Sequence, residues 1–102
     1  MKLVTIALTA ASLFIATQAM AGIELAQKNA CTACHSVDKK IVGPAFKDVA
    51  AKYKGDKTAE AKLVKKVKEG GKGVWGEIPM PPNAQVKDED IKAIVHWVLS
   101  LK

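Results

Sequence analysis

The stretch Cys31-Thr32-Ala33-Cys34-His35 decides the fold of this chain, and it contains the only two cysteines among 102 residues. Cys-x-x-Cys-His is the spacing at which two thiols and an imidazole hold one haem. On a helical turn, the two sulfurs lie three residues apart and can add to the two vinyl groups on one porphyrin edge. The imidazole of His35 then faces the iron. The motif therefore predicts one covalently bound haem c, attached through Cys31 and Cys34, with His35 as an axial ligand.

Three other interpretations compete with haem attachment: a redox dithiol, half of a zinc site, or a disulfide in an exported protein. A redox dithiol is expected at the start of a helix that follows a buried strand, and no such strand pattern precedes Cys31. A zinc site requires four ligands, and the only further nitrogen or sulfur donor of the usual kind is His96. In a helix over residues 91–102, His96 points away from the apolar face, so we expect it to be a solvated surface residue.

Residues 1–21 have the pattern of a secretory signal peptide. Lys2 gives a positive start, residues 3–16 are apolar apart from Thr and Ser, and Ala19-Met20-Ala21 offers small residues for cleavage. Cleavage leaves residues 22–102 as a single domain without stable membrane insertion, and it predicts a periplasmic location, where bacteria attach haem to thiols. An uncleaved membrane anchor is the alternative, because the uncharged run of residues 3–23 is long enough to span a bilayer.

The domain of residues 22–102 is too small to form an extensive core. Chains of this size bury only about 60% of the surface that the unfolded chain exposes, and they commonly depend on a metal, disulfides or a prosthetic group. A haem would supply a large apolar surface around which short helices pack. We therefore expect the haem-free chain to be weakly folded.

The chain has 16 lysines and no arginine, against 10 Asp and Glu, for a formal net charge of +6. A lysine surface without arginine and with few aromatic residues favours long-range attraction to acidic partners and is not typical of a nucleic-acid interface. Most of these lysines are expected on solvated helix faces. Lys28, Lys39, Lys40 and Lys47 are candidates for orienting a redox partner near the haem edge.

Hydrophobic periodicity predicts four helical segments and no strand of useful length, and hence an all-α fold. The segments are residues 23–34, 44–53, 58–70 and 88–102. Residues 71–87, rich in Gly and Pro, form a long connection, and such loops in a small domain usually carry function. The residues expected to face the core are Leu25, Ala26, Phe46, Val49, Ala50, Tyr53, Leu63, Val64, Val67, Ile91, Ile94, Val95, Val98 and Leu101.

Met80 is the candidate for the sixth position of the haem iron, whose occupant separates electron carriers from ligand-binding or catalytic haem proteins. It lies in Pro79-Met80-Pro81-Pro82, where the prolines restrict the backbone to extended or polyproline conformations. A stiff loop loses less entropy when a weak thioether bond forms. The alternative is that Met80 merely fills a gap in the core.

Further motifs accompany these along residues 22–102. They are Val42-Gly43-Pro44 with residues 47–52, Gly73-Val74-Trp75-Gly76, residues 78–83, and the ending Trp97-Val98-Leu99-Ser100. Together with the Cys-x-x-Cys-His motif, they resemble the small bacterial monohaem class I cytochromes c of the c-551/c-552 type. This resemblance implies the small class I cytochrome c fold, about four short helices wrapped around one covalently bound haem.

The resemblance also implies His35 and Met80 as the axial ligands, with the Pro44 carbonyl accepting a hydrogen bond from the other nitrogen of His35. When both ligands stay bound in the ferrous and the ferric state, the iron changes charge with little structural rearrangement. The expected function is therefore one-electron transfer by Fe(II)/Fe(III) cycling, and the chain is not expected to be an enzyme. A haem enzyme or gas sensor with a labile Met80 is the alternative.

Three more site residues follow from the same resemblance. Trp75 is expected to donate its indole N–H to a haem propionate, and Asn83 to hydrogen-bond near the Met80 sulfur. Lys66 stands where some relatives have an arginine directed to a propionate. A lysine can donate to a propionate but cannot form the planar fork of an arginine.

The expected partners are redox proteins of a respiratory chain, engaged by brief docking. A quinol–cytochrome c reductase fits as the donor, and a terminal oxidase, a nitrite reductase or a peroxidase fits as the acceptor. We expect a monomer without a nucleic-acid partner.

Overall fold

The computed structural model describes residues 21–102. The predicted signal peptide of residues 1–21 therefore lies outside the described residues, apart from Ala21. Within the described range, no helix is both long enough and apolar enough to cross a membrane.

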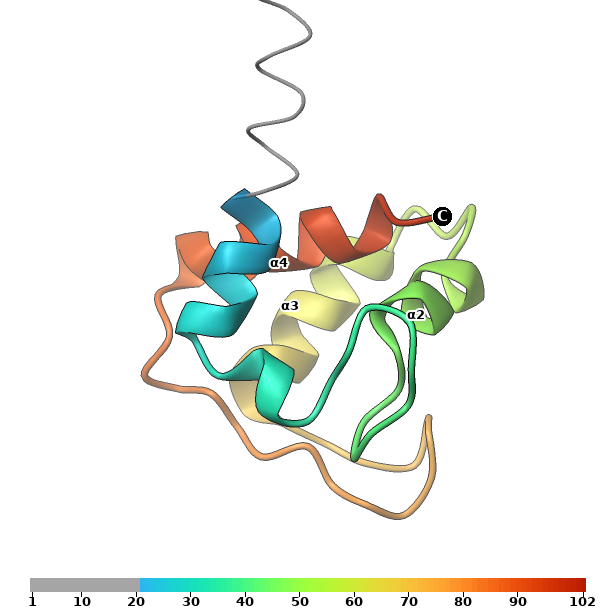
Figure 1. The fold of residues 1–102 in the computed structure, drawn as a ribbon, viewed down its shortest axis with the longest axis horizontal. Helices are drawn as coiled ribbons and strands as arrows, with labels where there is room; N and C mark the ends of the chain where they lie inside the picture. The colour runs from blue at the N-terminus through green and yellow to red at the C-terminus, as the bar shows by residue number, and fades with distance from the viewer. Residues whose placement is uncertain (1–20) are drawn as a thin grey trace, which may run out of the picture.

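The described chain consists of short helices joined by loops (Figure 1). Residues 21–28 are helical, and the 3-10 helix η1 (Cys31–Ala33) follows them. Three α-helices complete the domain: α2 (Phe46–Lys52), α3 (Ala59–Glu69) and α4 (Asp88–Leu99). From residue 21 onward, β-type pairing is limited to two isolated bridges. The prediction of an all-α fold is confirmed.

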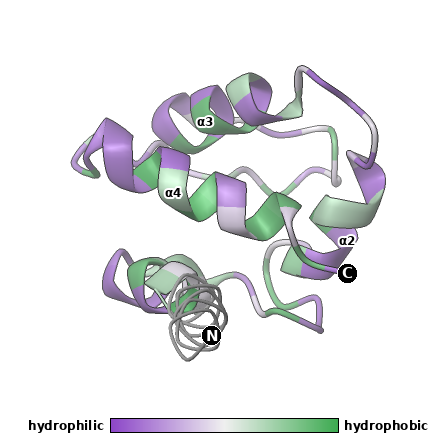
Figure 2. Ribbon diagram, turned by 90° about the horizontal axis from the view of Figure 1, so that it is seen from above, coloured by the Kyte–Doolittle hydropathy of each residue, from purple (hydrophilic) through white to green (hydrophobic). Residues whose placement is uncertain are grey.

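Helix α4 is the centre of the fold, because it packs against both α2 and α3. Figure 2 shows it between α3 and the helical residues 21–28. His96 is exposed, as predicted from its position off the apolar face. The predicted core positions are buried or partly buried. The buried hydrophobic residues are Ala26, Ala45, Phe46, Val49, Ala50, Ala59, Val86, Ile91, Ile94, Val95 and Val98.

The first helix is shorter than predicted, because it ends at residue 28 and does not reach Cys34. The backbone N–H and the side-chain amide of Asn29 both donate to the Leu25 carbonyl, at 3.1 and 2.9 Å, and such a side-chain bond competes with helix continuation. Ala30 then adopts a positive φ of 63°, which a right-handed helix does not contain. The Cys-x-x-Cys-His motif therefore starts on a separate turn, η1.

Helix α2 begins at Phe46 and not at the predicted Pro44. Ala45 precedes the helix with φ −60° and ψ 143°, outside helical geometry. The first N–H groups of a helix have no partners within it, and the Ser36 carbonyl accepts from the N–H of Phe46 at 2.8 Å. Pro44 thus lies in the loop before the helix, where its carbonyl is available to a side chain.

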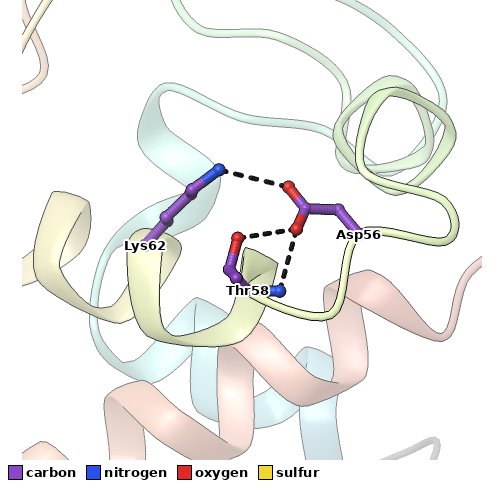
Figure 3. A network of polar contacts seen from close by, with 3 residues as sticks. All are labelled: Asp56, Thr58 and Lys62. Carbon is purple, nitrogen blue, oxygen red and sulfur yellow. Dashed lines mark hydrogen bonds and ion pairs between the residues drawn. The ribbon is translucent and has the colours of Figure 1, made fainter.

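Helix α3 follows a small polar network, shown in Figure 3. One carboxylate oxygen of Asp56 accepts from the N–H of Thr58 at 2.8 Å and from its hydroxyl at 2.6 Å. The other oxygen pairs with Lys62 at 3.3 Å. These contacts lower the pKa of Asp56, with the Thr58 hydroxyl as the largest cause, because they stabilise the ionised carboxylate.

We predict that Asp56 stays ionised to a lower pH than an ordinary aspartate, in an NMR titration of its carboxyl group. A group with a lowered pKa stabilises the fold above its unfolded pKa of about 3.9, and this contribution is lost as the pH falls through the folded value. Thr58→Ala should raise the pKa of Asp56. Lys62→Gln, which removes a smaller cause, should raise it less. An unchanged titration in Thr58→Ala would contradict the prediction.

Candidate functional site

A cavity of about 400 Å³ lies among η1, α2, α3, α4 and the loop that follows α3. Its volume is within the roughly 300–1,000 Å³ of small-molecule and cofactor sites. Its walls are mostly hydrophobic, and core residues of all three α-helices contribute to them. All the predicted site residues except Asn83 line this cavity, namely Cys31, Cys34, His35, Pro44, Lys66, Trp75 and Met80.

The two cysteines are presented by η1 and the residue after it. The turn is closed by hydrogen bonds to the Cys31 carbonyl from the N–H groups of Cys34 at 3.2 Å and of His35 at 3.0 Å. Both thiols are free, so the disulfide interpretation is not supported. Both side chains are half-buried at the cavity wall, where they can react with a bound group.

The redox dithiol and zinc interpretations also lose support. Burial raises the pKa of the Cys31 thiol, whereas a redox dithiol requires a thiol with a lowered pKa. In residues 21–102, no cluster of three or more His, Cys, Asp or Glu side chains is arranged to hold a metal ion. What remains is a group that binds both thiols and one imidazole.

His35 is held in one tautomer by the segment before α2. Its Nδ1 lies 2.7 Å from the Pro44 carbonyl oxygen. A carbonyl can only accept, so Nδ1 carries the hydrogen and Nε2 keeps its lone pair. The ring of Phe46 stacks on the imidazole, with centroids 5.1 Å apart and an interplanar angle of 20°. The imidazole thus presents one nitrogen donor and has restricted freedom to rotate.

Met80 is held by its main chain. It forms one of the isolated bridges with Gly71: the N–H of Met80 donates to the Gly71 carbonyl at 2.8 Å, and the N–H of Gly71 to the Met80 carbonyl at 3.0 Å. Gly70 ends α3 with φ 77°, and a Cβ on it would lie 2.6 Å from the Met80 carbonyl oxygen. The close approach of Met80 to the end of α3 therefore requires glycine at position 70.

Asn83 fastens the same loop from outside the cavity. Its backbone N–H donates to the Val67 carbonyl at 3.0 Å. Its side-chain amide donates to the carbonyls of Val67 at 3.2 Å and Pro81 at 3.1 Å. The amide nitrogen has two hydrogens and these are its two partners. Hydrogen bonding near the Met80 sulfur stays a prediction for Asn83, and it requires the amide to exchange a partner.

Trp75 lies at the edge of the cavity with 42% of its surface exposed. The amine of Lys52, at the end of α2, lies 5.5 Å from the centre of its ring, within the range of a cation–π contact. The sequence reasoning missed Lys52, because spacing along the chain carries no sign of a pairing between α2 and the loop. Lys66 lines the same cavity, and its amine lies directly against Gly71.

The lysines proposed to orient a partner do not form a uniform set. Lys28, Lys39, Lys40 and Lys47 are all exposed, but only Lys40 lines the cavity. Lys47 pairs with Asp38 at 2.6 Å, which compensates its charge. Large exposed hydrophobic residues, which can contact a partner, are Ile41, Val42, Val74, Trp75 and Ile78.

The donor set fits a covalently attached haem. The cavity combines two free thiols, an imidazole with one available nitrogen, a thioether and apolar walls. Amine and indole groups at its edge, from Lys66 and Trp75, are suited to carboxylates such as propionates. These features define a small all-α protein that binds haem through its cysteines.

Comparisons with known proteins agree with this class. Residues 19–102 match the model of the cytochrome c family. The chain is 60% identical over 87 residues to cytochrome c-551 of Allochromatium vinosum, covering 85% of this chain and 93% of that relative. It is 53% identical over 93 residues to cytochrome c-552 of Nitrosomonas europaea, covering 91% and 90% of the two chains. The crystal structure of Nitrosomonas europaea cytochrome c552 superposes with a TM-score of 0.76 at 55% identity, covering 78% of this chain and 99% of that one.

The chain therefore belongs to the cytochrome c family, as a small class I monohaem member with the fold of that class. Its prosthetic group is a covalently bound haem c, and its general function is electron transfer. The resemblance noted from the sequence is confirmed.

We predict that the double variant Cys31→Ala/Cys34→Ala loses most of its helical signal in far-UV circular dichroism. Apolar side chains such as Val49, Ile94 and Val98 line the cavity, and without haem they lose their packing partner, which destabilises the fold. Wild-type chain made without haem is the matched control and should be equally unstructured. Native helicity in both haem-free chains would show that the fold does not need the group.

Proposed function

We propose that this protein is a periplasmic one-electron carrier in which His35 and Met80 are the two axial ligands of the haem iron. The supporting observation is that one cavity contains both thiols and two donors suited to iron, an imidazole nitrogen and a thioether. The bound haem supplies the Fe(II)/Fe(III) couple. The surrounding side chains and loops position the ligands, set the reduction potential and bind the redox partner.

The two ligands are supplied by segments that are already held in place. His35 is oriented by the Pro44 carbonyl, and the Met80 backbone is bonded to Gly71 at the end of α3. Little movement is therefore needed when the iron changes charge. An enzyme or gas sensor requires the Met80 sulfur to leave the iron, and the two main-chain bonds to Gly71 limit that movement to rotation of the side chain.

The same residues favour the reduced state of the iron. A thioether is a soft donor, and soft donors stabilise ferrous iron. The apolar walls, including Val49 and Val98, exclude water and disfavour the additional charge of ferric iron. We therefore expect a fairly positive reduction potential.

We propose that electrons pass at the cavity edge during brief docking of acidic redox partners. The exposed hydrophobic residues at this edge, including Val42, Val74 and Ile78, provide a contact surface. Lys40 lines the same cavity, and the net positive charge attracts acidic partners over longer range. A respiratory quinol–cytochrome c reductase fits as donor, and a terminal oxidase, nitrite reductase or peroxidase as acceptor. The signal-like residues 1–21 support the periplasmic location, and we propose that the carrier is a monomer.

Replacement of Met80 tests the ligand assignment. We predict that the wild-type ferric protein has the far-red charge-transfer band of sulfur-ligated haem and that Met80→Ala loses it. The ferrous wild type should not bind carbon monoxide at neutral pH, whereas Met80→Ala should bind it. Rapid binding of carbon monoxide by the wild type would instead favour the gas sensor or enzyme.

A second prediction concerns electrostatic steering. Oxidation of the ferrous protein by ferricyanide, an anionic oxidant, should be fast at low salt and on the order of tenfold slower at high salt. Lys40→Gln at the cavity edge should slow this reaction more than Lys92→Gln, which removes an exposed lysine of α4 that does not line the cavity. Equal effects of the two substitutions, measured by stopped-flow, would contradict a role for the cavity edge.

A further inference from the structure

The imidazole of His35 lies in a slot formed by residues 43–46. Gly43 borders the ring, the Pro44 carbonyl accepts from Nδ1 at 2.7 Å, and the Phe46 ring stacks at a centroid distance of 5.1 Å. The slot therefore combines a close backbone contact, a polar contact and an aromatic contact on a single side chain.

Gly43 is required by the ring and not by the backbone. A Cβ on Gly43 would lie 2.5 Å from Cε1, 2.8 Å from Nδ1 and 3.0 Å from Nε2 of His35. Carbon atoms normally approach to about 3.5–4.0 Å, so a methyl group would displace the ring by roughly 1 Å. Gly43 is not among the glycines with positive φ, so its backbone accepts an L-residue. The three heavy atoms nearest to an added Cβ all belong to the His35 ring, so the ring opposes a side chain there.

The slot is tied to the chain on both sides of His35. The N–H of Gly43 donates to the Cys34 carbonyl at 2.8 Å, and the N–H of Phe46 donates to the Ser36 carbonyl at 2.8 Å. Cys34 and Ser36 are the immediate neighbours of His35. The register between the slot and the imidazole is therefore set by main-chain bonds.

We propose that Gly43 and Phe46 are positioning residues that set the rotation of the His35 ring at the iron. This inference rests on the proposed function, because it requires His35 to be an axial ligand. The hydrogen bond to Pro44 selects the tautomer, and the two flanking contacts fix the plane of the ring. Partners outside the ligand set commonly tune a bound metal by orienting its ligands.

The test compares holoprotein variants. Gly43→Ala adds the opposing methyl group, and Phe46→Leu removes the stacked ring. Gly55→Ala is the matched control, because Gly55 has φ 81° and no atom lies within 4 Å of its added Cβ. It strains the backbone without reaching the slot. The readouts are the ferric NMR shifts of the haem methyl groups, the reduction potential, and the exchange rate of the His35 Nδ1 proton.

We expect Gly43→Ala to change the spread of the haem methyl shifts and the potential, and to accelerate exchange of the Nδ1 proton roughly tenfold as the bond to Pro44 weakens. Gly55→Ala should lower stability and leave all three readouts unchanged. Wild-type shifts, potential and exchange in Gly43→Ala would overturn the proposal. Should Gly43→Ala fail to mature, Phe46→Leu decides in the same way, because wild-type readouts in it would overturn the role of the slot.

These outcomes are distinct from a failure of the proposed function. The sulfur band of the wild type reports ligation by Met80, independently of the slot. Its absence would contradict the carrier, whereas unchanged methyl shifts in a variant that retains the band would contradict only the positioning role of Gly43 and Phe46.

Discussion

The hydrogen bond from Nδ1 of His35 to the Pro44 carbonyl is the contact on which the rest of the site depends. It leaves Nε2 as the donor nitrogen, and it joins the Cys-x-x-Cys-His motif to the loop that precedes α2. Phe46 then stacks on the imidazole and meets Trp97 of α4 edge-on, with ring centroids 5.5 Å apart. One side chain is thereby connected through two aromatic contacts to the central helix, so that the orientation of the imidazole and the packing of the core support each other.

The second donor, Met80, is held in place by main-chain hydrogen bonds. Met80 has a flexible, apolar side chain whose sulfur is only a weak hydrogen-bond acceptor, and the loop compensates by fixing its backbone. The bridge to Gly71 and the bonds from Asn83 to Val67 attach this loop to α3. Because α3 packs on α4, the loop of Met80 is connected to the same central helix as His35. A small core can therefore hold two donor side chains at one cavity.

The sequence predicted the features that depend on local pattern. The all-α fold, the core face of α4, the exposure of His96 and the set of residues around the cavity, apart from Asn83, all followed from spacing and from the family resemblance. Features that depend on contacts between distant segments did not follow. The break at Ala30, the late start of α2 and the contact of Lys52 with Trp75 arise from backbone or side-chain partners that periodicity does not reveal. The role of Gly43 does not follow from its motif, because it depends on the position of the His35 ring.

The tautomer of His35 can be observed directly by ¹⁵N NMR on the ferrous holoprotein with labelled histidine. We predict a slowly exchanging hydrogen on Nδ1, bonded to the Pro44 carbonyl, and no hydrogen on Nε2. A hydrogen on Nε2, or an Nδ1 proton that exchanges as fast as in free imidazole, would contradict the central claim that Pro44 prepares His35 for the metal.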